Sequence, residues 1–186
     1  GMEYEGGWLW NHGSSDIYME PMYPHSGQYS LGIRRTSGQA ALWGDLEDRI
    51  PTSQSLRYTV DGWLSGTNAR NAALGVVFYQ GRTGDNFISE QTTPFTTGSV
   101  SWTHYYTNLS TPGGGWYANV RCRNEAPVSG TGAARFDDLR LVEWTNDWTN
   151  IGTGLTTLAY PTEHASIQLR CNQAVTSAAV AYRMTT

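Results

Sequence analysis

Lysine is absent from the 186-residue sequence, so all 12 basic residues are arginines. The chain therefore has no side-chain amine for Schiff-base formation or nucleophilic attack. Charged residues are scarce as well, at 15% of the sequence, and the net charge of −4 is spread along the chain rather than gathered in blocks. This distribution lacks the basic surface that binds nucleic acids or membranes. We therefore expect neither nucleic acid nor a membrane as a partner.

Cysteine is limited to Cys122 and Cys171. Two thiols cannot form a zinc site alone, so they either form one disulfide in an oxidising compartment or are buried as free thiols. The sequence leaves both alternatives open.

Long apolar segments are also missing. The sequence has no run of about 18 apolar residues and no basic N-terminal segment followed by an apolar one. We therefore expect neither a membrane span nor a signal peptide. Met2 after Gly1 suits a native start, although a domain excised from a longer secreted protein would look the same.

Glycine, tryptophan and tyrosine are plentiful, with 21, 8 and 11 residues. This composition is typical of an ordered, turn-rich β protein, and the length suits one well-cored domain. Apolar residues alternate with polar ones between Gly- and Pro-rich turns, which predicts short strands. The clearest predicted strands lie in 25–34, 56–64, 72–79, 102–107, 116–123 and 133–142. We predict an all-β antiparallel sandwich in which residues 1–186 form one domain.

The end of the chain weakly repeats an earlier segment. Trp102-Thr103 and Val120-Arg121-Cys122 are followed, in the same order, by Trp148-Thr149 and Leu169-Arg170-Cys171. Residues 144–186 are therefore predicted to add strands to a core of 3–143, as a partial repeat of 102–142. Chance similarity between β segments is the alternative.

Two adjacent carboxylates interrupt the predicted strand at 133–142. On a regular strand Asp138, Arg140 and Val142 would share a face with Phe136, and Asp137 would point to the other face. One acid must then face the interior or lie at a rim, and a buried carboxylate needs a partner or a cation. Because their side chains diverge, the two acids are poorly placed to act as the carboxylate pair of a glycosidase.

Several spaced motifs together resemble the jelly-roll carbohydrate-binding modules of the family 4, 9 and 22 type. The resemblance covers roughly residues 3–143 and rests on the order and spacing of the motifs. These are Glu5-Gly6 with Trp8 or Trp10, His25 to Leu31, Tyr58 to Trp63, Trp102, and Phe136 to Leu139. The resemblance implies a jelly-roll sandwich that binds glycans.

The resemblance also implies a metal, because a structural calcium commonly ties the first strand of such modules to the last. The carboxylate ligands would be Glu5 together with Asp137 or Asp138, near the backbone carbonyls of residues 25–27. Calcium takes about six to eight oxygen ligands of this kind. The alternatives are an ion pair with Arg135 or Arg140, or a solvated carboxylate at the strand end.

Sugar binding needs exposed aromatic rings, on which the apolar C–H faces of pyranose rings stack, and polar side chains for the hydroxyl groups. Most aromatic residues must lie in the core, so those in Gly-rich or polar contexts are the best candidates. The predicted ligand-binding residues are Trp8, Trp10, Trp43, Tyr79, Trp116 and Tyr117, with Arg57 and Arg121 as hydroxyl partners.

Catalytic motifs are missing. The four histidines are isolated, and neither a Gly-x-Ser-x-Gly elbow nor a phosphate-binding loop occurs. We therefore predict a non-catalytic module that binds a polysaccharide or oligosaccharide, extracellular or at the cell surface as part of a larger secreted protein. The alternative is a structural or receptor-binding appendage of a phage-like virion, assembled as a homo-oligomer through the C-terminal segment. A small polysaccharide-active enzyme is a third hypothesis.

Overall fold

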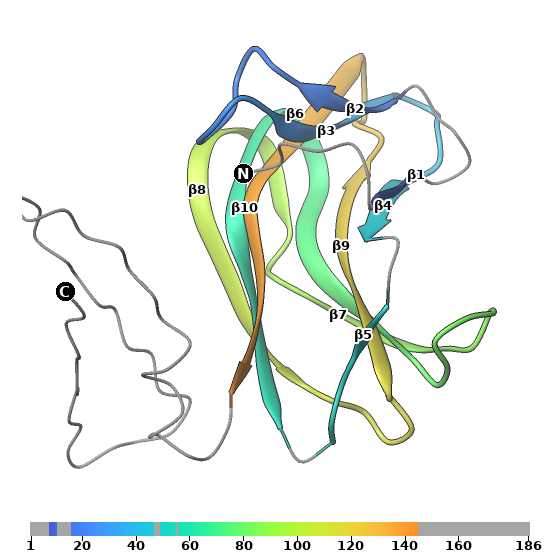
Figure 1. Ribbon diagram of the computed structural model, residues 1–186. Coiled ribbons are helices and arrows are strands. Elements are labelled where there is room, and N and C mark those ends of the chain that lie inside the picture. The colour runs from blue at the N-terminus through green and yellow to red at the C-terminus, as the bar shows by residue number, and fades with distance from the viewer. Residues whose placement is uncertain (1–7, 11–15, 47–48, 55, 145–186) are drawn as a thin grey trace, which may run out of the picture.

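The structure is a computed structural model that describes residues 8–10, 16–46, 49–54 and 56–144. Within this part every regular element is a strand, as predicted (Figure 1). The strands are β1 (Trp8–Trp10), β2 (Ile17–Glu20), β3 (Ser30–Thr36), β4 (Leu42–Leu46), β5 (Ile50–Pro51), β6 (Arg57–Tyr79), β7 (Phe87–Thr92), β8 (Thr96–Ser110), β9 (Tyr117–Glu125) and β10 (Thr131–Trp144). No helix able to cross a membrane occurs among these residues.

All strand pairs are antiparallel, and the strands form the two layers of a sandwich. We name sheet I the layer with the order β2-β3-β10-β6-β8, and sheet II the layer with the order β1-β4-β9-β6-β7. β5 pairs with β9 as a short addition to sheet II. This is the antiparallel β-sandwich that the alternation of apolar residues predicted.

β6 belongs to both sheets, because it crosses from one to the other (Figure 1). Its first half pairs with β10 in sheet I and its second half with β9 in sheet II. The sequence predicted two strands with a loop over 65–71, but that segment is the crossing itself. Asn68 and Asn71 have positive φ angles of 48° and 45° there, a backbone region that asparagine enters more readily than most residues. Asn68 Nδ2 also donates to the carbonyls of Ser129 and Thr131, at 3.1 and 3.2 Å.

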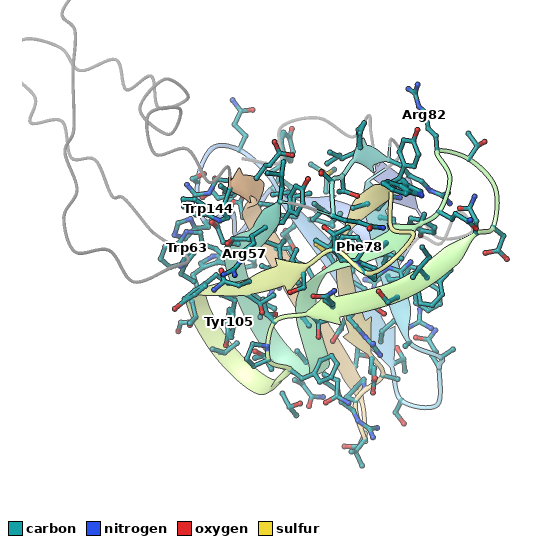
Figure 2. The ribbon with its side chains drawn as sticks, turned by 90° about the horizontal axis from the view of Figure 1, so that it is seen from below. Arg57, Trp63, Phe78, Arg82, Tyr105 and Trp144 are labelled. Atoms are coloured by element: carbon teal, nitrogen blue, oxygen red, sulfur yellow. The ribbon has the colours of Figure 1, made fainter. Side chains whose placement is uncertain are left out.

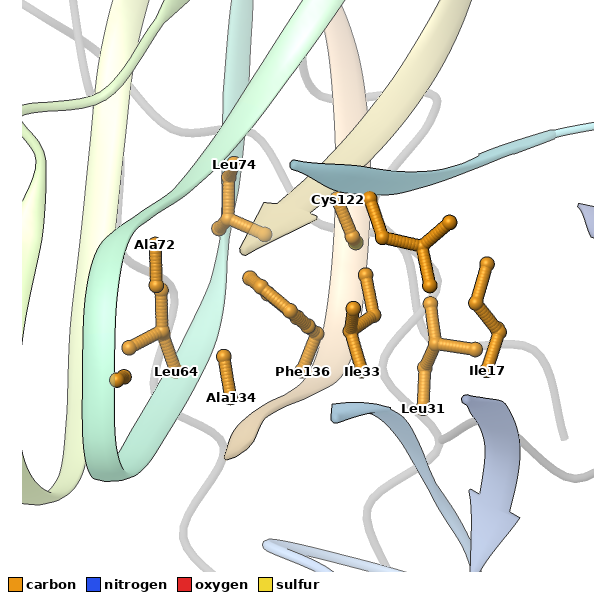
Figure 3. Packing of buried hydrophobic residues seen from close by; sticks show 11 residues of the cluster. Ile17, Leu31, Ile33, Leu64, Ala72, Leu74, Cys122, Ala134 and Phe136 are labelled. Carbon is orange, nitrogen blue, oxygen red and sulfur yellow. The ribbon is translucent and has the colours of Figure 1, made fainter. Parts of the chain in front are cut away.

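Two apolar clusters fill the space between the sheets. In the first, Phe136 and Leu31 of sheet I pack with Leu74 of sheet II (Figure 3). In the second, Val60 and Phe78 are among the fully buried members. Burying an apolar side chain of this size contributes roughly 1.5–3 kcal/mol, so these clusters hold the two sheets together.

Cys122 lies in the first cluster as a free thiol with no exposed surface. Burial raises the pKa of this thiol well above its ordinary value, so the reactive thiolate is suppressed. Of the two alternatives for the cysteines, Cys122 follows the buried one. Cys171 lies outside the described residues.

The fold differs from the sequence prediction in further places, and β2 and the last two residues of β4 were not predicted as strand. The alternation does not predict β7, and the structure gives the reason, because no residue of this edge strand is fully buried. Strands predicted for 144–186 lie outside the described residues, except that Trp144 ends β10.

Candidate functional site

The two adjacent acids lie at a β-bulge in β10. Asp137 pairs with Trp63, and pairing resumes only at Arg140, opposite Asp61. Asp138, between them, has a positive φ of 51°. A bulge inserts extra residues and shifts the alternation of the strand. The prediction that Arg140 shares a face with the buried Phe136 is therefore wrong, and Arg140 lies on the outer face of sheet I.

Both carboxylates reach the loop between β2 and β3. The buried Asp137 accepts hydrogen bonds through Oδ2 from the backbone N–H groups of His25 and Ser26, at 2.9 and 3.0 Å. Asp138 accepts one from Ser26 Oγ at 2.7 Å and lies 2.8 Å from His25 Nδ1. The expectation that the two side chains diverge is wrong, because the bulge turns both toward this loop.

The same contacts set the ionisation of Asp138. Burial raises the pKa of its carboxyl group, whereas hydrogen bonds from Ser26 and His25 lower it, and the net pKa is about 2. Asp138 is therefore a carboxylate at neutral pH, and it anchors the loop to β10.

The described residues fit the expected calcium ligands only in part. They contain no group of three or more His, Cys, Asp or Glu side chains placed to hold a metal. Asp137 is fully buried, and both of its oxygens already accept N–H groups. The side chain of Asp138 is 29% exposed and is already engaged by Ser26 and His25. Glu5 lies outside the described residues, and calcium stays a prediction.

A second group of predicted residues meets on the outer face of sheet II, which points away from the core. Trp43 on β4 pairs with Arg123 on β9, and Asp45 pairs with Arg121. The next strand across from β9 is β6, which has only small side chains at three successive outward positions. These are Ala73, Gly75 and Val77.

One guanidinium links three strands of this face. Arg121 donates from Nε and Nη2 to the two oxygens of Asp45, both at 2.6 Å. Its Nη1 lies 3.7 Å from Glu90 Oε2 on β7. Burial lowers the pKa of Arg121, but the bonds with Asp45 more than compensate and raise it. The bridge therefore keeps its charge and fixes the guanidinium at the middle of the face.

Three polar atoms on this face are buried and have no hydrogen-bond partner within the described residues: Glu90 Oε1, Asn119 Oδ1 and Arg123 Nε. Asn119 and Glu90 flank Val77 on the two neighbouring strands. A buried polar atom without a partner costs about 1–3 kcal/mol. Water molecules or the hydroxyl groups of a ligand would remove this cost.

Aromatic rings lie at both ends of the face. At one end Trp43 is 37% exposed, and Phe95, beside Arg123, is 53% exposed. At the other end Tyr79 pairs with Tyr117, and the backbone N–H of Trp116, whose side chain is 51% exposed, donates to the Tyr79 carbonyl at 3.0 Å. The structure thus brings together five of the predicted ligand-binding residues, Trp43, Tyr79, Trp116, Tyr117 and Arg121.

The other predicted residues do not add to this face. Arg57 lies beside Trp144 on sheet I, and both are on the same side of the sandwich as Trp63 (Figure 2). Trp8 and Trp10 belong to β1, next to β4, but the structure describes only the backbone of these two residues.

Tyr79 belongs to the face but presents little of its ring. It is only 8% exposed, and the guanidinium of Arg49 lies 3.5 Å from its ring centre. At this end a ligand ring would therefore stack on Trp116 rather than on Tyr79.

Sequence reasoning did not single out four polar residues of the face. Asp45 follows Gly44 in a stretch that the sequence predicts as an acidic turn, and Glu90 lies in a strand without clear alternation. Asn119 and Arg123 carried a usable signal, because strict alternation along β9 places both on the same face as Arg121.

Comparisons with known proteins define the fold. No protein-family model and no curated protein matches the sequence. Among solved structures, the CBM22-2 xylan-binding domain of Xyn10C from Paenibacillus barcinonensis matches with a TM-score of 0.52 and 11% identity, over 75% of this chain and 92% of that one. The fold is therefore that of the jelly-roll carbohydrate-binding modules, as the motifs implied.

Two larger proteins contain a similar domain. The enzymatically active domain of tailspike protein 4 from bacteriophage CBA120 matches with a TM-score of 0.57 and 12% identity, over 75% of this chain and 20% of that one. An arabinose-bound α-L-arabinofuranosidase matches with a TM-score of 0.54 and 14% identity, over 74% of this chain and 23% of that one. The present chain thus spans less than a quarter of either protein.

Proposed function

We propose that the protein binds a glycan chain on the outer face of sheet II and does not cleave it. The observation that carries this proposal is the arrangement of that face. Residues with exposed rings, Trp43 and Trp116, lie at its two ends, and between them lie buried hydrogen-bonding atoms that have no partner among the described residues. Sugars present both apolar C–H faces and hydroxyl groups, so they match both features.

The proposed contacts with the glycan are of two kinds, stacking and hydrogen bonding. Trp43 and Trp116 would stack on sugar rings, Arg121 would donate to sugar oxygens, and Glu90 Oε1 and Asn119 Oδ1 would accept hydroxyl protons. The outward positions of β6 from Ala73 to Tyr79 span roughly 20 Å, at about 3.3 Å per residue. The ligand would therefore be an oligosaccharide segment rather than a single sugar.

The carboxylates support binding rather than catalysis. A glycosidase needs two carboxyl groups free to reach either side of the scissile bond, one of them with a raised pKa. Asp45 is held through both oxygens by Arg121, and Asp137 and Asp138 are engaged by the loop at His25. The similarity in fold to a domain named for xylan binding points in the same direction.

Affinity gel electrophoresis with a panel of polysaccharides tests the proposal. We expect retardation by at least one of them, and Trp43→Ala should weaken it at least about tenfold. Tyr23→Ala is the matched control, because Tyr23 is an exposed ring that lies beside Arg135 of sheet I. If no polysaccharide retards the protein, or if Trp43→Ala and Tyr23→Ala behave alike, the proposal is wrong.

A second candidate function is that of an appendage of a phage-like particle, which the similarity in fold to a tailspike domain supports. Such a protein would act on the virion, whereas a glycan-binding module would be extracellular or on the cell surface. Light scattering coupled to size-exclusion chromatography separates the two. A stable homo-oligomer favours the appendage, and a strict monomer favours the isolated module.

A further inference from the structure

The outer face of sheet I, on the opposite side of the sandwich, has no part in the proposed function. At its centre three neighbouring strands contribute one row of paired residues: Tyr106 on β8, Asp61 on β6 and Arg140 on β10. These strands run side by side (Figure 1). Because neighbouring strands lie about 4.8 Å apart, the outer two residues are roughly 10 Å apart with Asp61 between them.

Asp61 is a buried acid with one oxygen in use. It is 6% exposed, and its Oδ1 accepts a hydrogen bond from Arg140 Nε at 2.8 Å. Within the described part of the chain its other oxygen, Oδ2, accepts no hydrogen bond. Arg140 is 65% exposed and uses only Nε in this pair. The row therefore offers an acceptor and the two Nη donor groups next to each other.

The third member of the row supplies an aromatic surface. Tyr106 is 49% exposed, and its ring lies 6.2 Å from that of His104 at an angle of 26°. His104 Nε2 is buried, has no hydrogen-bond partner in the part of the chain that the structure describes, and lies 3.6 Å from Asp61 Oδ1. This is a second polar atom beside the acid that a ligand or a water molecule would satisfy.

The rings farther along the same face have a structural role instead. His25 stacks on Trp63 with the ring centres 3.9 Å apart and also contacts Trp102. Since His25 is tied to Asp138, this stack holds the loop between β2 and β3 on the sheet. Within the row, Tyr106 and Arg140 are exposed, at 49% and 65%.

We propose that Tyr106, Asp61 and Arg140 form a second sugar-binding site on the face opposite the first. An uncharged sugar ring would stack on Tyr106, donate a hydroxyl proton to Asp61 Oδ2 and accept hydrogen bonds from the Nη groups of Arg140. Asp61 disfavours an anionic ligand, and the charged pair disfavours a purely apolar one. The two sites share only the class of ligand, and together they let one molecule hold two glycan chains.

Calorimetric titration of the full chain with xylohexaose, cellohexaose and β-1,4-galactotriose tests the second site. Trp43→Ala removes a main contact of the first face, so the binding that remains reports on the second. In that background Tyr106→Ala or Arg140→Ala should weaken the remaining binding at least about tenfold. Tyr23→Ala and Arg34→Ala are matched controls, since both side chains are exposed and lie outside the row.

The outcomes separate the two sites. If Trp43→Ala abolishes all binding, or if Tyr106→Ala and Arg140→Ala behave like their controls, the second site is refuted while the first stands. If Tyr106→Ala alone removes binding, the second site stands and the first is refuted.

Sedimentation without sugar tests the alternative that the row binds a second copy of the chain. A wild-type dimer that Tyr106→Ala converts to monomer would overturn the sugar assignment in favour of a second copy of the chain.

Discussion

At the scale of single residues, Asp138 shows how one backbone distortion decides what a side chain does. Its positive φ turns the carboxylate toward Ser26 and His25, whose hydrogen bonds exist only in the folded chain. The pKa falls from 3.8 to about 2 on folding. A carboxyl group with a lowered pKa in the folded state stabilises the protein above its unfolded pKa, and this contribution is lost as the pH falls through the folded pKa.

We therefore expect Asp138→Asn to lower the free energy of unfolding by roughly 1–2 kcal/mol at neutral pH. The difference from wild type should be full above pH 3.8 and shrink as the pH falls toward 2. Denaturant unfolding across this range measures it, with Asp85→Asn in an exposed turn as the control. A difference that stays constant down to about pH 2 would contradict the role given to the loop contacts.

The residues on the outer face of sheet II show which binding side chains can be predicted from the sequence. Trp43 and Arg121 were predictable, because a large ring beside a glycine and an arginine within an alternating strand are local features. The bulge at Asp138 was not, since it arises from pairing with β6, which is distant in sequence. Glu90 was not predictable either, because its position depends on an edge strand with no buried face.

At the scale of elements, β6 determines the architecture by crossing between the sheets. Alternation predicted its first half, and the continuous apolar run over 72–79 predicted its second half, which is buried on both faces. The crossing itself was predicted as a loop, since its Gly and Asn residues resemble turn residues in sequence. Only the continuous pairing of β6 with its neighbours in both sheets shows that it is one strand.

We expect Asn68→Val to lower the free energy of unfolding by roughly 1–3 kcal/mol, because a β-branched residue resists positive φ and the two hydrogen bonds of Asn68 are lost. Asn68→Gly keeps the backbone conformation and should cost less. Urea unfolding of the three proteins measures both effects. Equal stability of the valine and glycine variants would show that the positive φ is not required.

At the scale of the whole molecule, the sandwich has a polar and aromatic surface on each of its two outer faces. Hydrogen bonds connect β10 to the loop at His25, and we expect calcium to stabilise this connection by binding Asp138. A ligand that binds only the folded state raises the melting temperature, by the equivalent of about 2.7 kcal/mol at a hundred times its dissociation constant.

Calorimetric melting with excess calcium and with chelator measures the effect, and Asp138→Asn should abolish it. Equal melting temperatures in calcium and chelator would argue that the hydrogen bonds alone hold the loop.

The central claim is that a glycan lies across the outer face of sheet II. A nuclear magnetic resonance titration of the ¹⁵N-labelled full chain with the oligosaccharide that binds best tests it most directly. We predict shifts of the Trp43 indole N–H, the Arg121 guanidinium and the Asn119 side-chain amide that saturate together with binding. Saturable binding that leaves all three signals unchanged would contradict the account.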